Sequence, residues 1–74
     1  MDDSRKAIKR LIANNIKKYR AKAKLTQEEA SEKADLSLNY WQRIEMISQK
    51  DIPSIPTLAK ISKVLQVSLK DFFI

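Results

Sequence analysis

The sequence predicts an all-α fold: one domain over residues 1–74 with five helices and a helix-turn-helix at about residues 26–46. Thr26 and Glu29 have the S/T-x-x-E spacing of a capping box, and Ser37 can cap a second helix shortly after it. Only a tight turn fits between two helices placed so closely, and short helices on such a turn cross steeply. Val, Ile and Thr are too scattered along the chain to indicate strands.

Composition narrows the possible functions. The 74 residues are enough for one domain with one small core. Because the chain has neither Cys nor His, it lacks thiolate chemistry, the commonest general base and the commonest metal ligand, so we expect no catalytic residue, metal or cofactor. No apolar run approaches the ~20 residues that span a membrane, and no secretory signal is evident, so a cytoplasmic domain is expected.

The net charge of +6 at pH 7 is unevenly distributed. Residues 1–24 hold nine Lys or Arg against two Asp, and residues 25–51 hold three against six acidic residues. A small basic domain favours a polyanionic partner, although charge also serves solubility. The basic N-terminal segment therefore points to nucleic acid, while the acidic centre keeps a protein partner open.

The first helix is predicted from Arg5 to about Ala23, with a frayed end before it and Asp3 or Ser4 as its N-cap. Its apolar residues recur in steps of three and four, which is typical of an amphipathic helix with one buried stripe. The residues expected in that stripe are Ala7, Ile8, Leu11, Ile12, Ile16, Tyr19 and Ala23. Those expected on the other faces are Lys6, Lys9, Arg10, Lys17 and Lys18. Such a helix could lie on an anionic membrane, but the helices that follow can cover its stripe, which favours core packing.

The helix-turn-helix comes next. Its first helix is predicted from about Gln27 to Ala34 and its second from Leu38 to at least Glu45. A polar loop then leads to Pro53.

A fourth helix and a last short turn complete the chain. Ser54 can cap the fourth helix, which tolerates Pro56 in its first turn. The core residues expected on this helix are Ile55, Leu58, Ile61 and Leu65. Ser68 and Asp71 have capping-box spacing for a final turn over residues 68–73.

Three groups of residues carry a family resemblance: LTQEEASEKADLS at residues 25–37, then Tyr40, Ile44 and Glu45, then PSIPTLAKISKVLQVSLKDFF at residues 53–73. Together they resemble the Cro/CI-type (XRE-like) helix-turn-helix regulators. The resemblance implies a five-helix, lambda-repressor-like domain that binds specific sequences in double-stranded DNA. It also implies a transcriptional repressor that acts as a homodimer on a palindromic operator.

Four positions where the family commonly has Gly are occupied differently, because this chain contains no Gly; they are Lys24, Asp35, Ile47 and Gln66. Such positions often need φ > 0, which costs a non-Gly residue roughly 1 kcal/mol or more and suits a β-branched residue worst. The link from Glu45 to Pro53 is also longer than is usual in the family. We therefore expect the third helix to run on through Ile47.

Trp41 is expected in the core. Together with Ile44 it shares one face of the third helix with Leu36. The family usually has Val or Ile at Trp41, Leu at Ala30 and Ala at Ser31, so the indole is expected to fill volume that Ala30 leaves.

The opposite face of the third helix carries the candidates for reading DNA. An α-helix fits the major groove, where Asn and Gln can pair with adenine, Arg can pair with guanine, and Leu can only contact a thymine methyl. The matching family positions are Leu38, Asn39 and Arg43, with Ser37 and Gln42 as secondary candidates. Each polar candidate could instead be ordinary solvated helix surface.

Candidates for phosphate contact flank that helix. Gln27 opens the preceding helix, where its side chain and the free N–H groups of the helix end can bind a phosphate. The other candidates are Tyr40, Lys22, Lys24, Gln49 and Lys50. The resemblance also implies a partly buried ion pair between Arg20 and Glu45 that fixes the third helix against the first.

A second copy of the chain is expected, because one recognition helix reads too few base pairs to select one site in a genome. Two copies on a twofold axis would read half-sites about one helical turn, ~34 Å, apart. One helix face cannot bury three successive apolar residues at 72–74, and an exposed apolar patch usually marks a contact. The residues expected at the dimer interface are Val67, Leu69, Phe73 and Ile74, with Phe72 at the core or its boundary. Alternatively, the tail folds back over Leu65 and Ile61, or the chain is part of a longer regulator.

Other classes of function fit the sequence less well. A protein-interaction module, such as an antitoxin that masks a toxin, would suit the acidic central segment. RNA binding would need exposed stacking aromatics, and only Tyr40 qualifies. We expect no enzyme activity, no membrane partner and no small-molecule ligand, and we expect a bacterial or phage-encoded protein.

Overall fold

The computed structural model describes residues 3–74, and in that range it contains four α-helices, one 3-10 helix and no strand. The elements are α1 (Asp3–Lys22), α2 (Gln27–Lys33), α3 (Leu38–Glu45), α4 (Ile55–Leu65) and η1 (Leu69–Phe73). The predicted all-α class is confirmed. The fifth element, predicted as a last short turn, is a 3-10 helix, so the five predicted helices correspond to four α-helices and this 3-10 helix in the described chain.

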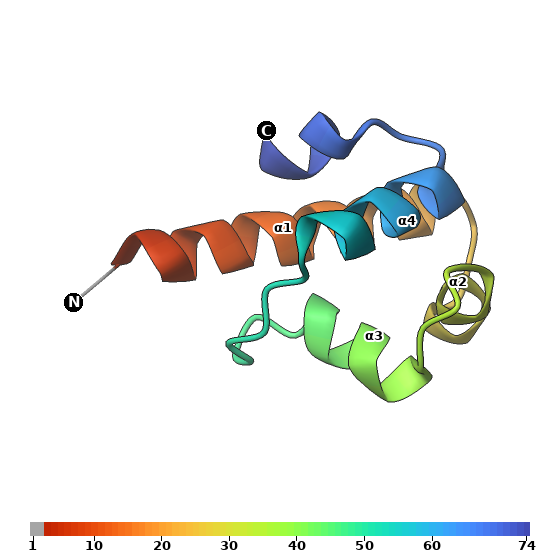
Figure 1. The fold of residues 1–74 in the computed structure, drawn as a ribbon, viewed down its shortest axis with the longest axis horizontal. Helices are drawn as coiled ribbons and strands as arrows, with labels where there is room; N and C mark the ends of the chain where they lie inside the picture. The colour runs from red at the N-terminus through yellow and green to blue at the C-terminus, as the bar shows by residue number, and fades with distance from the viewer. Residues whose placement is uncertain (1–2) are drawn as a thin grey trace.

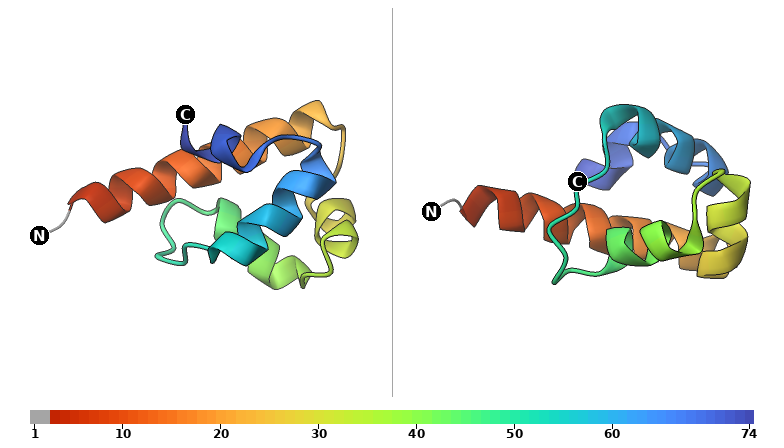
Figure 2. Two further views of the ribbon diagram at one scale, coloured as in Figure 1. Left: turned by 45° about the horizontal axis from the view of Figure 1, so that its top comes forward. Right: turned by 60° about the horizontal axis from the view of Figure 1, so that its bottom comes forward.

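The long helix α1 organises the molecule, and α3, α4 and η1 all pack against it. Figure 1 shows η1 on one side of α1 and α3 on the other. The N-terminal half of α1 projects beyond the remaining helices in all three views (Figures 1 and 2). Figure 1 also shows that α3 lies at an edge of the molecule, and its outer side is exposed.

One core joins the elements. Trp41 and Phe72 are its largest fully buried side chains, which confirms the predicted place of the indole. The rings of Tyr19 and Phe72 are tilted by 56° with centroids 6.5 Å apart, which links α1 to η1. The remaining large side chains that are fully buried are Ile12, Ile16, Ile44, Leu58 and Ile61. Burying one such side chain contributes about 1.5–3 kcal/mol.

The ends of α1 differ from the prediction. The helix already begins at Asp3 and ends at Lys22, so Asp3 and Ser4 lie within it and neither is the N-cap. Residues 1 and 2, where part of the frayed end was expected, lie outside the described residues.

The buried stripe of α1 is shorter than predicted. Ile12 and Ile16 are buried, but Ala7, Ile8 and Ala23 are exposed. The reason is that the first turns of α1 extend past the elements that cover its middle (Figure 1), and that Ala23 lies beyond the end of α1. The periodicity identified the helix but not the length over which other helices cover it.

Side-chain caps begin three of the helices. At α2, the Thr26 hydroxyl accepts from the N–H of Glu29 at 3.0 Å, and the Glu29 carboxylate accepts from the N–H of Thr26 at 2.9 Å. Ser37 and Ser54 accept in the same way from the N–H three residues on, at 3.1 and 3.3 Å. Each such cap contributes about 1 kcal/mol.

Left-handed residues end three of the helices. Lys24, Asp35 and Gln66 have φ of 61°, 58° and 59°. In each case the N–H of the following residue bonds back to a carbonyl in the last turn, at 3.2, 2.9 and 3.0 Å. These are Schellman motifs, which usually place Gly at the left-handed position.

Two predictions about the middle of the chain were wrong. The third helix ends at Glu45 and does not run on through Ile47, because Met46 takes extended backbone angles of φ −91° and ψ 110°. Ile55 is 57% exposed, because the buried face of α4 begins one turn later, at Leu58.

Gln66→Gly should raise the free energy of unfolding by roughly 1 kcal/mol, because Gly adopts positive φ without the steric cost of a Cβ. Thermal denaturation measures this change. Lys63→Gly is the matched control. It places Gly at an exposed position inside α4, where φ is negative, and should lower the free energy of unfolding by about 1 kcal/mol. Equal destabilisation by both changes would contradict the strain at Gln66.

Candidate nucleic-acid interface

The outer face of α3 carries the residues predicted to read bases. Ser37, Leu38, Asn39 and Gln42 are exposed, and Arg43 is half-buried. Tyr40, at the border, is half-buried as well, whereas Trp41 and Ile44 on the opposite face are fully buried. The fold therefore brings the five base-reading candidates to one side of α3 and its N-cap.

The inner side of α3 is held by the Glu45 carboxylate. Arg20 of α1 donates to it twice, from Nε at 2.6 Å and from Nη2 at 3.0 Å. Gln27 of α2 donates from Nε2 at 2.9 Å, and Trp41 donates from its indole nitrogen at 2.7 Å. The remaining terminal nitrogen of Arg20 donates to the carbonyl of Leu25 at 2.9 Å.

Burial and hydrogen bonding act in opposite directions on the pKa of Glu45. Burial by itself raises this pKa, whereas the hydrogen bonds from Arg20, Trp41 and Gln27 and the charge of Arg20 lower it. The net result is a pKa below the ordinary value, so Glu45 is a carboxylate at neutral pH. The donations of Trp41 and Gln27 were not anticipated, although Trp41 and Glu45 have the i, i+4 spacing that places two side chains on one helix face.

Arg43 has two neighbours that sequence reasoning missed. Its Nε donates to Oδ2 of Asp51 at 2.8 Å, and both side chains of this ion pair are 41% exposed. Its guanidinium carbon lies 5.5 Å from the centre of the Tyr40 ring, within cation–π range. Asp51 lies in the loop after α3, and no helical period connects it to Arg43.

Lys9 was expected on a solvated face but is buried, and the prediction was wrong. Its ammonium donates to the carbonyls of Arg43, Ile44 and Asp51 at 3.0, 2.8 and 2.7 Å. Burial lowers the pKa of Lys9, and the Asp51 carboxylate opposes that shift. A signal existed in the sequence, because Lys9 is one turn before Ile12 on the buried stripe.

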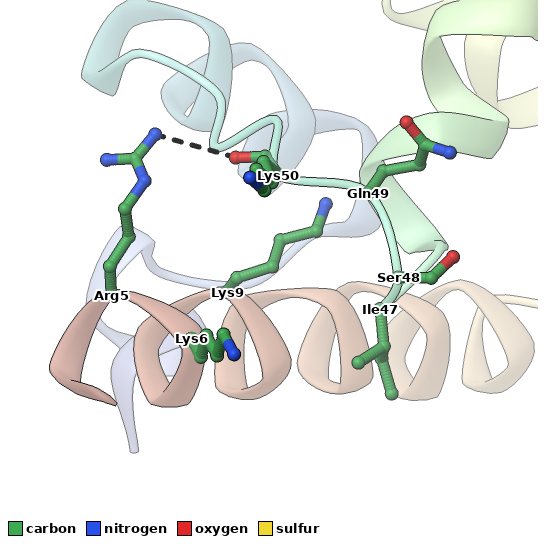
Figure 3. Close-up of a pocket in the computed structure, with 7 residues that line it drawn as sticks. All are labelled: Arg5, Lys6, Lys9, Ile47, Ser48, Gln49 and Lys50. Atoms are coloured by element: carbon green, nitrogen blue, oxygen red, sulfur yellow. Dashed lines mark hydrogen bonds between the residues drawn. The ribbon is translucent and has the colours of Figure 1, made fainter. Parts of the chain in front are cut away.

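Two grooves lie near α3, the first between α1 and the loop that follows α3, the second lined in part by α3 itself. Figure 3 shows the first, about 540 Å³, where Lys9 reaches from α1 toward the loop and Arg5 donates to the carbonyl of Lys50 at 3.5 Å. This groove contains two phosphate candidates, Gln49 and Lys50, both exposed. The second, about 380 Å³, is lined by Lys17, Gln27, Gln42, Glu45 and Met46.

The other phosphate candidates lie at the end of α1 and the start of α2. Lys22, the last residue of α1, and Lys24 are both exposed, and Lys22 has its ammonium 5.6 Å from the Tyr19 ring. Gln27 is half-buried, with its amide nitrogen committed to Glu45. The fold thus gathers Gln27 near Gln42, but it places Lys50 in a different groove.

The candidates for dimerisation lie at η1. Phe72 is fully buried, whereas Phe73 and Ile74 are 42% and 77% exposed. Asn15 of α1 donates to the carbonyls of Phe72 and Ile74 at 2.9 and 3.2 Å, so the tail follows α1. Val67 and Leu69 are half-buried against the core.

Among residues 3–74, no helix is long and apolar enough to cross a membrane.

A helix-turn-helix whose second helix presents an exposed polar face defines the class of this domain. The helix-turn-helix family HTH_3 matches residues 16–72, and the chain belongs to this XRE-type family. A solved structure described as an HTH_3 family transcriptional regulator from Vibrio cholerae is similar, with a TM-score of 0.83 and 29% sequence identity. The alignment covers 93% of this chain but only 38% of that regulator. No curated protein matches the chain.

Glu45→Gln should lower the free energy of unfolding at pH 7 by about 3 kcal/mol, because it leaves the guanidinium of Arg20 without its charged partner. The wild-type contribution should be complete above the unfolded pKa of about 4.3. It should be lost as the pH falls through the lower pKa of folded Glu45.

Urea unfolding between pH 7 and pH 3 tests both expectations. Exposed Glu32→Gln is the control, since it removes a carboxylate without touching the Arg20 pair. If wild type and Glu45→Gln lose stability in parallel as the pH falls, the role of Glu45 is refuted.

Proposed function

We propose that this protein binds specific sequences in double-stranded DNA and represses transcription as a homodimer on a palindromic operator. The exposed polar face of α3 carries the proposal, because its opposite face is fixed to α1 and α2 through Glu45. Family membership and the similar transcriptional regulator support the same class of function.

In the proposed complex, α3 enters the major groove with its N-terminal turns toward the base edges. Asn39 and Gln42 can each pair with adenine, Arg43 with guanine O6 and N7, and Ser37 with either purine. Leu38, which is 37% exposed, would contact a thymine methyl. Because Glu45 holds α3 against α1 and α2, these side chains would meet the base edges in one fixed alignment.

The flanking residues would hold the DNA backbone. Gln27, Tyr40, Lys22, Lys24, Gln49 and Lys50 are the proposed phosphate contacts. Lysines that displace condensed counterions from phosphates make binding weaken steeply as salt rises. These contacts set position and affinity, whereas α3 sets the sequence preference.

Arg43→Ala should weaken specific binding by about 1–3 kcal/mol and relax the preference at one base pair of each half-site. Lys50→Ala should instead weaken binding to all sequences alike, because a phosphate contact carries no sequence information. Selection of bound sequences from random duplex DNA measures both. An unchanged base preference in Arg43→Ala would remove Arg43 from base reading.

We propose that the homodimer forms through the η1 end of the molecule. Phe73 and Ile74 are exposed while their neighbour Phe72 is buried, so the apolar surface there is uncovered in a single copy. Val67 and Leu69 would complete the contact. Two α3 helices related by a twofold axis would then read two half-sites ~34 Å apart.

Phe73→Asp combined with Ile74→Asp should dissociate the dimer, because it buries two carboxylates in an apolar contact. Sedimentation at micromolar concentration measures the change, and Ile55→Asp is the control for an exposed apolar residue elsewhere. A wild-type monomer that binds one copy per site would refute the dimer. A dimer that survives the double change would refute only this surface.

The alternative is a protein-interaction module such as an antitoxin. Glu28, Glu29 and Glu32 are all exposed on α2, next to the proposed reading helix, and this acidic surface would suit a basic protein partner. Weak binding to DNA that does not change with salt would favour the alternative.

A further inference from the structure

The ammonium of Lys9 fixes where Arg43 lies relative to the following loop. Its three hydrogen bonds reach the carbonyls of Arg43 and Ile44 in the last turn of α3 and the carbonyl of Asp51 in the loop. An ammonium has three donors, so this set uses all of them. The main chains of Arg43 and Asp51 are therefore tied to one atom.

The side chains of the same two residues also meet. Asp51 accepts from Nε of Arg43 at 2.8 Å, and the Tyr40 ring lies beside the guanidinium. Within residues 3–74, the terminal nitrogens of Arg43 make no hydrogen bond, which leaves one edge of the guanidinium available. Arg20 differs, because its Nε and both terminal nitrogens are bonded within the fold.

We infer that Asp51 is a positioning residue that orients Arg43 for guanine recognition, with Lys9 holding the two residues in register. The inference rests on the proposed DNA-binding function and assigns a source of its specificity. A guanine is bound through two parallel hydrogen bonds to O6 and N7, which requires a guanidinium with a free edge and a fixed direction. The Nε contact to Asp51 supplies the direction and leaves the terminal edge free.

The position of Asp51 also affects the binding of unrelated sequences. The ion pair is well exposed and contributes little to folding stability. Near DNA, however, the Asp51 carboxylate is repelled by phosphates at every sequence, which lowers the affinity for all duplexes alike. Asp51 therefore strengthens discrimination through the orientation of Arg43, whereas its charge lowers affinity without regard to sequence.

The experiment compares wild type with Arg43→Ala, Asp51→Asn, Asp51→Glu and Glu32→Gln. Asp51→Asn keeps the main-chain carbonyl that Lys9 binds, and Glu32→Gln makes the same change of net charge away from Arg43. Selection from random duplex DNA first identifies the base pair whose preference Arg43→Ala abolishes. The affinity of every variant is then measured for the selected duplex, for the duplex changed at that pair, and for an unrelated duplex.

Wild type and Glu32→Gln should discriminate about tenfold at that base pair. Asp51→Asn should discriminate less than about twofold at the base pair that Arg43 reads, and it should keep the wild-type preferences at the other base pairs. Its affinity for the unrelated duplex should equal or exceed that of wild type. Asp51→Glu, which keeps a carboxylate, should recover part of the discrimination. Thermal denaturation of Asp51→Asn should show at most a small loss of stability: the exposed pair contributes little, and the three carbonyls that bind the ammonium of Lys9 remain, although the Asp51 charge that favours this ammonium is lost.

Three outcomes would overturn the inference. If Asp51→Asn keeps the full wild-type discrimination at the base pair that Arg43 reads and binds every duplex more tightly, then Asp51 only reduces the charge of Arg43 and does not orient it. Equal loss at every base pair would mean that Asp51 supports the fold and not Arg43 in particular. A wild-type protein that selects no sequence would refute the proposed function and this inference with it, whereas the first two outcomes leave that function intact.

Discussion

Four hydrogen bonds converge on the Glu45 carboxylate, and the relative positions of α1, α2 and α3 depend on it. A buried carboxylate is costly unless its oxygens are fully bonded and its charge is paired. Arg20 supplies the charge and a bidentate contact, while Trp41 and Gln27 supply the remaining donors. Because these donors come from three helices, α3 cannot rotate or slide without leaving a buried charge unpaired.

The absence of Gly imposes a second constraint. Lys24, Asp35 and Gln66 each hold a left-handed conformation that ends a helix. At roughly 1 kcal/mol each, these positions together cost a noticeable part of the 5–15 kcal/mol that stabilises a typical domain. The side-chain caps at Thr26, Ser37 and Ser54 offset a comparable amount at the opposite helix ends.

The features that the sequence predicted well are local ones. Thr26, Ser37 and Ser54 each indicate a helix start, because each can accept from the backbone N–H three residues later. The helical period alone predicts that Trp41 is buried and that Asn39 is exposed. The errors share a different cause, because burial at a helix end depends on which other element reaches it. Ile8 and Ile55 fit the apolar periodicity of their helices, but both are exposed, because no other helix packs over that turn of α1 or α4. The Arg43–Asp51 ion pair depends on the path of the loop after α3, which the helical periodicity of the sequence does not specify.

Lys9 lies outside the residues that the family model matches, yet it helps to hold α3. The match begins at residue 16, and the Lys9 ammonium binds the last turn of α3. Cations are favourable at a helix C-terminus, because the final carbonyls carry partial negative charge. Lys9 and Arg20 lie about 16 Å apart along α1 at 1.5 Å per residue, and their side chains approach the end of α3 from two directions. The extended α1 thus immobilises the turn of α3 that contains Arg43, while the first turn of α3 stays uncovered for contact.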